Sequence, residues 1–525
     1  MALVALAGLV VVAVQARELV AALYLNPDYA SAPVIASAIG DAPHDRIVTL
    51  GNYPWYESLW MLRATEWLPG HRQVWQGLPF LISVATIGIV VRSCWRTFGP
   101  WAAAATAAAL AVTSSGMRPV LFTLDAHGGA VTHAVVLGAV LVVAARRPAL
   151  PTRQLVLGGA VLAAFTAAGA TDRLLLVTGI LPFALAPLLV WWLTGTGVYR
   201  RLAIAATGVA VASVAGGEAL TALMHQQDVV PLPTFVLHFA GSGDAPVHLE
   251  VLLDALADLG GGRFFGEQVD AGGLIDAMTG SAVILAALVG SVAAIRWTRG
   301  LAEGRVGRDG GTPAARSQVL FVTFWLLAFA LPALSFMLTS APQEAGSSRY
   351  LVIVFFALAA VLPALAVAMP RARRVLVVGV LGFSIATLGR HVVEGAETFG
   401  GGPSGPDAAA TAGWLRDQDL HVGYAGYQDA PVLTWASRGK LAVHPVYTNV
   451  GRTTQPLCRF PLHTISSWYT PRPATRTFII AHAPAGYTQL AEPSPAFGRP
   501  VATKTFGRLA IYVYDHDVGS QLGTG

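Results

Sequence analysis

Charged residues are scarce in this chain. Only 12% of its 525 residues are charged and 54% are hydrophobic, whereas ordinary soluble domains carry about 25% charged residues. This composition excludes an ordinary soluble domain and indicates an integral membrane protein. Lysine is almost absent, because only Lys440 and Lys504 of the 34 basic residues are lysines. Such a bias is typical of a GC-rich genome, so the net charge of +5 is no evidence for nucleic acid, and no nucleic-acid partner is expected.

Cysteine is also scarce. Cys94 lies beside a basic segment and Cys458 lies in the C-terminal part of the chain. Two isolated cysteines exclude a disulfide scaffold and a cysteine-based metal site.

The first residues allow two interpretations. Residues 2–14 followed by Val14-Gln15-Ala16 have the pattern of a signal peptide with a small-residue cleavage site. A first membrane span over 2–25 is favoured, because no Lys or Arg precedes the apolar run and the run resumes at Leu19. Pro27 is expected to end the first helix, and Asp28 lies outside the membrane in both cases.

Long apolar segments fill most of the rest of the chain. A membrane-spanning helix needs about 20 apolar residues. The sequence predicts about eleven such helices, near 2–25, 77–92, 100–115, 128–145, 155–171, 174–194, 202–223, 277–296, 317–339, 350–369 and 374–390.

Arginine predicts the orientation of these spans, because cytoplasmic loops retain positive charge. With the N-terminus inside, the short outer connections contain only Arg118, Arg173, Arg349 and Arg390. The inner loops collect the larger set: Arg92, Arg96, Arg146, Arg147, Arg153, Arg200, Arg201, Arg296, Arg299, Arg305, Arg308, Arg316, Arg371, Arg373 and Arg374. We therefore expect a multi-pass protein of the plasma membrane with a cytoplasmic N-terminus.

Three outer segments are long, namely 26–76, 224–276 and the tail after about 391. In the first, apolar residues recur at helical spacing over 54–68, which predicts a helix in the membrane interface. The tail mixes turn residues with short apolar runs and a helical stretch at 407–416, which predicts a small α/β domain. The expected division is a transmembrane domain over 1–392 and an extracytoplasmic α/β domain over 393–525.

Ionisable residues at the predicted outer ends of the spans are the candidates for chemistry, because such positions solvate them poorly unless they are paired. Alternatives remain for each: a turn residue for Asp28, an interfacial anchor for Arg349, and a local ion pair for Asp172 with Arg173. The candidates are Asp28, Asp125, His127, Asp172, Arg173, Glu218, Arg349, Tyr350, Arg390 and His391.

A carboxylate can accept a proton from a hydroxyl nucleophile, and an arginine can bind a phosphate as charge develops on it. Sugar transfer from a lipid-linked phosphate needs both groups at a membrane boundary. No spacing in the outer segments specifies a metal, so no cofactor is expected to be required.

The sequence also resembles a family. An acid soon after the first span in LNPDYAS, an interfacial first outer loop, the SSRYL entry to a late span and a C-terminal outer domain together look like the GT-C superfamily. These are polyprenyl-phosphate-sugar-dependent membrane glycosyltransferases, and the resemblance is closer to bacterial protein mannosyltransferases and aminoarabinose transferases. It covers about residues 1–392.

The resemblance implies roles for individual residues. Asp28 is implied to be the catalytic base, and Arg349 is implied to hold the donor phosphate. We expect Tyr350 and Arg390 to bind that phosphate too. Asp28 is not followed by a second acid, unlike in the protein mannosyltransferase branch. Substrate-binding positions are expected at Glu57, Asp125, His127, Asp172 and Arg173.

The expected activity is inverting transfer of a sugar from a polyprenyl-phosphate donor to a hydroxyl of a cell-envelope glycan, lipid or protein. Two alternatives remain. A transporter or flippase of lipid-linked glycans is expected to have paired, broken spans with midplane charges, and neither is evident here. A non-catalytic glycan-binding protein would not need eleven spans.

Overall fold

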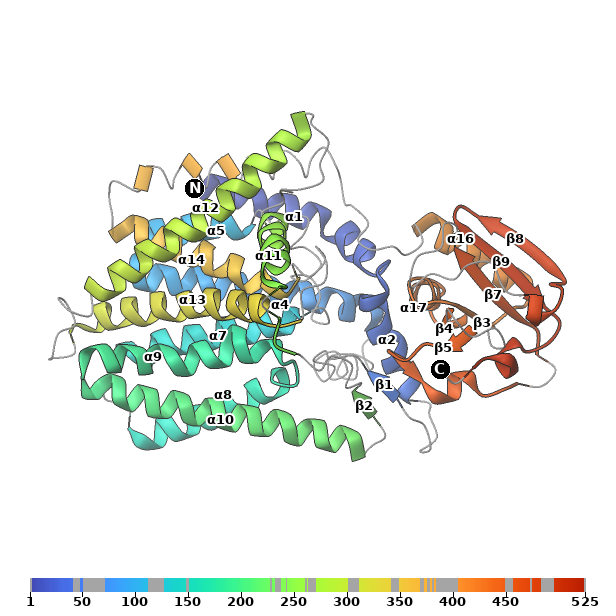
Figure 1. Ribbon diagram of the computed structural model, residues 1–525, viewed down its shortest axis with the longest axis horizontal. Coiled ribbons are helices and arrows are strands. Elements are labelled where there is room, and N and C mark those ends of the chain that lie inside the picture. Colours follow the sequence, from blue (N-terminus) through green and yellow to red (C-terminus); the bar gives the residue numbers. More distant parts are fainter. Residues whose placement is uncertain are drawn as a thin grey trace. The chain divides into compact units, whose positions relative to one another are not determined.

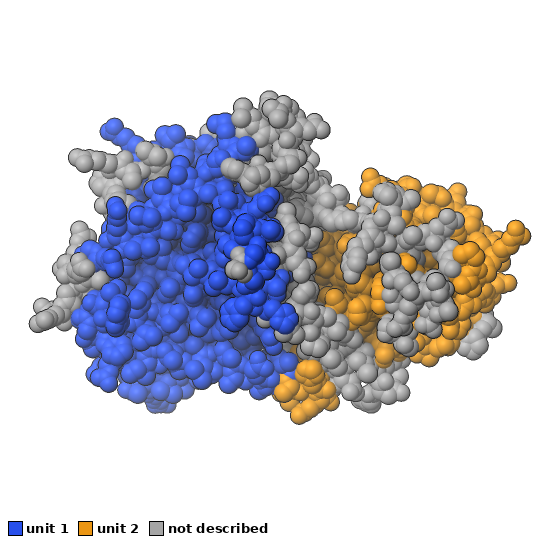
Figure 2. Space-filling view, viewed as in Figure 1, with its two compact units in different colours: residues 1–16, 76–221, 234–395 blue, residues 17–75, 222–233, 396–525 orange. Residues whose placement is uncertain are grey.

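The computed structural model describes most of the helices and the C-terminal sheet. The residues described are 2–40, 48–50, 71–111, 127–147, 151–226, 229–231, 238–241, 243–259, 262, 271–300, 311–340, 349–368, 373–374, 378–379, 382–383, 405–448, 457–472, 475–482 and 495–523. They form two compact units (Figure 2). Unit 1 comprises residues 1–16, 76–221 and 234–395, and unit 2 comprises residues 17–75, 222–233 and 396–525.

Unit 1 is a bundle of helices, several of which run side by side in Figure 1. Seven helical segments in the described part of the chain are long and apolar enough to cross a membrane, and each coincides with a span predicted above. The helices concerned are α4 (His71–Phe98), α7 (Gly128–Arg146), η1 with α9 (Leu176–Ile180 and Leu181–Thr194), α10 (Gly197–Gln226), α12 (Ala271–Gly300), α13 (Pro313–Leu338) and α14 (Val352–Ala368).

Three further predicted spans correspond to helices outside that set: α1 (Ala2–Leu23), α5 (Pro100–Ala111) and α8 (Thr152–Gly169). Most of the last predicted span, 374–390, lies outside the described residues. Helix α11 (Ala245–Leu259) lies in the predicted outer segment 224–276. The prediction of a polytopic helical membrane protein is therefore confirmed.

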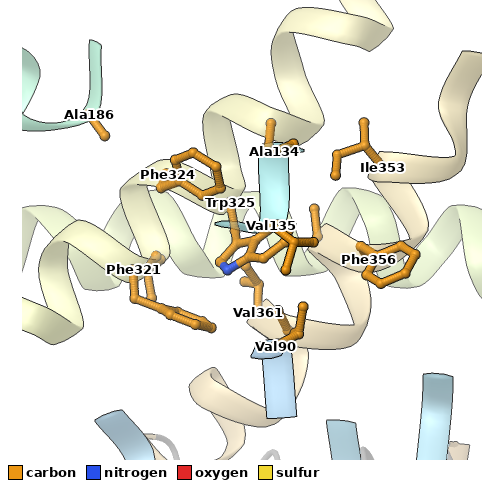
Figure 3. Packing of buried hydrophobic residues seen from close by; sticks show 14 of the residues in the cluster. Val90, Ala134, Val135, Ala186, Phe321, Phe324, Trp325, Ile353, Phe356 and Val361 are labelled. Carbon is orange, nitrogen blue, oxygen red and sulfur yellow. The ribbon is translucent and has the colours of Figure 1, made fainter. Parts of the chain in front are cut away.

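Helix α13 lies at the centre of the apolar core of unit 1 and packs against α7, α9 and α14. Figure 3 shows Trp325 of α13 among Phe324, Val135 and Val361. The Phe324 and Trp325 rings meet edge to face with their centroids 5.3 Å apart, an arrangement that aromatic rings favour. Gly138 of α7 lets Phe324 approach, because a Cβ at that position would lie 2.5 Å from the ring.

The turn after α1 differs from the sequence interpretation, in which Pro27 ended the first helix. Helix α1 ends at Leu23, and Pro27 begins a second helix, α2 (Pro27–Gly40). The Asn26 side chain caps α2 by accepting the Asp28 backbone N–H at 2.9 Å. Proline suits the first helical position because its missing N–H has no partner there anyway. Asp28 therefore lies in the first turn of a helix and not in a loop.

The C-terminal part of unit 2 is a six-stranded mixed sheet with the order β5-β4-β3-β7-β9-β8. Strand β3 pairs in parallel with β4 and β7, and the other pairings are antiparallel. This confirms the predicted α/β domain. The strands are β3 (Val422–Gly426), β4 (Ala442–Thr448), β5 (Leu457–Arg459), β7 (Thr477–His482), β8 (Ala502–Phe506) and β9 (Leu509–Tyr514).

Each face of this sheet has its own core. Helices α16 (Gly405–Asp417) and α17 (Ala430–Ala436) cover one face, where Leu415 and Leu433 pack with Phe478 and Val513. The other face carries a second apolar cluster that includes Tyr424 and other buried aromatic residues. Helix α2 also packs against α17, so the first outer segment is part of this unit.

A second, three-stranded sheet joins distant parts of unit 2. Strand β1 (Val48–Leu50) lies between β2 (Val229–Pro231), which is parallel to it, and β6 (Thr464–Ile465), which is antiparallel. The three strands come from the three segments predicted to be long and outside. Since backbone hydrogen bonds join them, all three segments must lie on the same side of a membrane.

Candidate functional site

A buried histidine–aspartate pair lies at one end of the helices of unit 1. His127 Nδ1 and Asp172 Oδ2 are 2.6 Å apart, and the two residues are only 6% and 2% exposed. The Tyr350 ring lies against the His127 ring with 5.1 Å between the centroids. The Arg349 guanidinium lies 5.2 Å from the Tyr350 ring centroid, and its Nη2 donates to Tyr350 Oη at 3.4 Å. We call His127, Asp172, Arg349 and Tyr350 the bundle-end group.

Local backbone structure presents these side chains. His127 has a left-handed backbone, φ 67°, directly before the first residue of α7. Histidine is one of the residues that tolerates this conformation more often than most. Asp172 lies in the turn after α8, where its Oδ1 accepts the Leu174 N–H at 2.9 Å. The Asp172 carboxylate therefore holds both its own turn and the His127 ring.

A π-helical segment, Leu176–Ile180, follows the Asp172 turn. Such segments are rare and occur frequently at functional sites. Sequence analysis missed it. The residue that could have drawn attention to it is Gly179, whose added Cβ would lie 3.0 Å from the backbone of Ala134 in α7. This segment packs against α7, the helix that begins directly after His127.

The bundle-end group is suited to an anion. Arg349 supplies a permanent positive charge, and α7 directs its N-terminus, with the partial positive charge of the helix dipole, to the same group. Asp172 pairs with His127 and not with Arg173, whose side chain is exposed. The alternative of a local ion pair between Asp172 and Arg173 is therefore wrong.

The remaining predicted site residues are distributed differently. Glu57, Asp125 and Arg390 lie outside the described residues. Asp28 belongs to unit 2, whereas the bundle-end group belongs to unit 1.

Asp28 is half-buried and bonded to the C-terminal domain. Tyr427 Oη donates to Asp28 Oδ1 at 2.9 Å. Ser31 Oγ, one turn further along α2, donates to Tyr427 Oη at 3.3 Å. The Tyr427 ring stacks on Phe460 at 4.6 Å, with the planes 7° apart, and lies 5.7 Å from the His463 ring. Asp28, Ser31, Tyr427, Phe460 and His463 form what we call the Asp28 group.

The surroundings of His463 in the Asp28 group shift its pKa. Burial lowers the pKa of His463 to about 4, and the nearby Asp28 carboxylate acts in the opposite direction. His463 is therefore uncharged at neutral pH. A cavity of about 10 Å³ borders Ser31 and His463, which is room for about one water molecule and too little for a sugar ring.

Tyr427, which bonds Asp28, was not among the candidates from the sequence. A usable signal was its position directly after β3, at the carboxyl end of a parallel strand, where α/β sheets place functional groups. The same edge holds a buried pair between Asp429 and His482 Nδ1, 3.1 Å apart. Burial raises the pKa of Asp429, and the hydrogen bond to His482 opposes that rise.

No cluster of three metal-ligating side chains occurs among the described residues. A resident metal therefore has no candidate site in that part of the chain.

Comparisons with known proteins return one solved structure of note. No family model and no curated protein matches the chain. The crystal structure of ArnT from Cupriavidus metallidurans in the apo state is similar over 98% of this chain and 98% of that chain, with a TM-score of 0.40 and 14% identity. At that identity and TM-score this likeness assigns neither an activity nor residue roles to the present chain.

Proposed function

We propose that this protein is a membrane glycosyltransferase of the GT-C type. It moves a sugar from a polyprenyl-phosphate donor to an extracytoplasmic hydroxyl of a cell-envelope glycan, lipid or protein. The proposal rests on the arrangement of the bundle-end group. An arginine, a tyrosine and a buried His127–Asp172 pair converge at the ends of apolar helices, where the phosphate of a membrane-embedded lipid would lie.

Arg349 is assigned to the donor phosphate, with Tyr350 beside it and Arg390 as a second cation. Arginine forks bind phosphate oxygens bidentately, and they stabilise the charge that grows on the phosphate as the sugar leaves. His127 and Asp172 are assigned to substrate binding, as are Glu57, Asp125 and Arg173. Because the Asp172 carboxylate fixes the orientation of the His127 ring, that ring can present a defined hydrogen-bonding nitrogen to a ligand.

Asp28 is assigned as the base. Its carboxylate accepts the proton of the acceptor hydroxyl while the acceptor oxygen attacks the anomeric carbon. The bond between that carbon and the phosphate oxygen breaks, and polyprenyl phosphate departs with the bonding electrons. One displacement inverts the anomeric centre, so a second carboxylate nucleophile is not required. Tyr427 supports this role, because its hydrogen bond fixes one oxygen of Asp28.

Donor-phosphate binding tests the assignment of Arg349. Purified protein in detergent would be titrated with a short-chain polyprenyl phosphate, and affinity would be measured by the rise in thermal unfolding midpoint. Arg349→Gln should bind about 10- to 100-fold more weakly, because hydrogen bonds to charged groups contribute about 1.5–3 kcal/mol.

Arg373→Gln is the matched control. Arg373 is also an arginine over an aromatic ring, 4.6 Å from the Trp101 centroid. This variant should bind as wild type does. Equal affinity in all three proteins would remove Arg349 from the donor site. Lipid movement between leaflets without any consumption of a sugar donor would favour the transporter alternative.

A further inference from the structure

A cluster of cationic and aromatic side chains lies on the face of the C-terminal sheet opposite α16 and α17. The pairing register of strands β3, β4 and β5 shows that several of its members share this face. Tyr424 of β3 is paired with His444 of β4, and Arg459 of β5 is opposite Val446 of β4. Since side chains two residues apart on a strand share a face, His444, Val446 and Arg459 lie on the same side as Tyr424.

The loops beyond these strands complete the cluster. Trp468 stacks on His444, with the ring centroids 5.1 Å apart and the planes at 20°. The Arg459 guanidinium lies 5.4 Å from the centre of the Tyr469 ring. Arg472 acts electrostatically on both Tyr424 and His444. Trp468 also borders the small cavity beside Ser31 and His463, so the cluster adjoins the Asp28 group.

Three nitrogens of the cluster are buried and have no hydrogen-bond partner in the part of the chain that the structure describes: His444 Nε2, Arg459 Nε and Arg472 Nη1. His444 is the most enclosed of the three residues, with 3% of its surface exposed. A buried polar atom without a partner costs about 1–3 kcal/mol, and more where the group is charged. Three such atoms in one cluster therefore indicate that an acceptor from outside the chain belongs there.

Charge favours the same conclusion. Among the described residues, the acid that contacts the cluster is Asp517, and backbone N–H groups already occupy both of its oxygens. Oδ1 accepts from Gly519 N at 2.8 Å, and Oδ2 accepts from Arg472 N at 2.6 Å. Tyr424 Oη also donates to Oδ1, at 3.4 Å. The acceptor capacity of the Asp517 carboxylate is thus largely used, which leaves little of it for the two guanidinium groups.

The His444 ring is uncharged at neutral pH. Burial, followed by the charge of Arg472, lowers its pKa to about 3. A neutral imidazole keeps one N–H, and the other ring nitrogen accepts. In the tautomer with the proton on Nε2, His444 adds a third donor without adding charge.

We propose that His444, Arg459 and Arg472, none of which is assigned to sugar transfer above, bind an oxyanion of the phosphate or carboxylate class. The two arginines supply charged N–H groups, and Nε2 of His444 supplies a neutral one. Arginine side chains match such groups geometrically because their N–H groups lie in a planar fork. The proposal does not depend on the glycosyltransferase assignment.

Anion titration of the full-length protein tests the site. Thermal unfolding midpoints would be measured against sodium phosphate and, separately, sodium acetate, with ionic strength held constant by sodium chloride. Wild type should show a saturable rise with at least one anion. Arg459→Gln and Arg472→Gln should each weaken the apparent affinity at least tenfold.

Arg476→Gln is the matched control, because Arg476 is an exposed arginine of the same domain. It should titrate as wild type does. Arg459→Lys keeps the charge without the planar fork and should bind with intermediate affinity; it replaces Arg459→Gln if that variant lacks a cooperative transition.

A response to phosphate alone or to acetate alone would define the class of oxyanion. An unsaturable rise of equal size in every variant would identify a general salt effect and overturn the proposal. The absence of any response in wild type would also overturn it.

Discussion

At the scale of single residues, Asp28 is distinguished by its partner rather than by its position alone. A carboxylate in the first turn of a helix is common, because the helix dipole stabilises negative charge there. Here Tyr427, from the far end of the sequence, donates to Asp28 Oδ1 at 2.9 Å. Phe460 and His463 in turn hold the Tyr427 ring. The C-terminal domain thus supplies a positioning residue for the proposed base.

Removal of the Tyr427 hydroxyl tests this role. Tyr427→Phe keeps the stacked ring and deletes the hydrogen bond to Asp28. We expect kcat to fall roughly tenfold with an unchanged KM for the donor, because a bond to a charged group is lost while donor contacts remain. Steady-state kinetics would measure both constants.

Tyr514→Phe is the control, since it makes the same chemical change on strand β9 in the same domain. It should leave both constants unaltered. A rise in donor KM without loss of kcat in Tyr427→Phe would mean that Tyr427 binds donor rather than positions Asp28.

At the scale of elements, the close contact between α7 and α13 depends on Gly138. Gly138→Ala should lower the thermal unfolding midpoint, because the new methyl would meet the Phe324 ring at 2.5 Å and the ring or helix must move. Overpacking of this kind costs about 1–3 kcal/mol.

Gly158→Ala is the paired control in α8. A Cβ at Gly158 meets nothing within 4 Å. Alanine is a better helix former than glycine, so this variant should be as stable as wild type or slightly more so. An equal loss of stability in both variants would mean that the α7–α13 contact is not as close as described.

Apolar periodicity predicted the helices well, since the seven span-length helices found among the described residues all coincide with predicted segments. The prediction failed at Pro27, because a proline can equally end one helix or begin the next. Here Pro27 begins α2, and the Asn26 side chain caps that helix through a hydrogen bond that the sequence alone does not reveal. The His127–Asp172 pair was found only as two separate candidates. Residues 45 positions apart meet through packing, which spacing alone does not reveal. Tyr427 was missed for the same reason.

At the scale of the whole molecule, the three-stranded sheet constrains the topology. It joins residues from 48–50, 229–231 and 464–465, so these segments share one side of the membrane. The arginine distribution predicts that this side is the outer one.

Cysteine labelling in intact cells tests that orientation. Both native cysteines are buried, so their background reaction should be low. Ser466→Cys should react with a membrane-impermeant maleimide in intact cells, whereas Arg200→Cys, in a predicted inner loop, should react only after permeabilisation. The reverse pattern would invert the topology and place the proposed chemistry on the cytoplasmic side.

Sugar transfer from a polyprenyl-phosphate donor, with Asp28 as the base, can be measured as the release of polyprenyl phosphate. Purified wild type and Asp28→Asn would each be given a panel of radiolabelled polyprenyl-phosphate sugars. We expect wild type to consume a donor and the variant to be about 10²- to 10⁴-fold slower, the usual contribution of a general base. Donor consumption at the wild-type rate by Asp28→Asn, or no consumption of any donor by wild type, would contradict it.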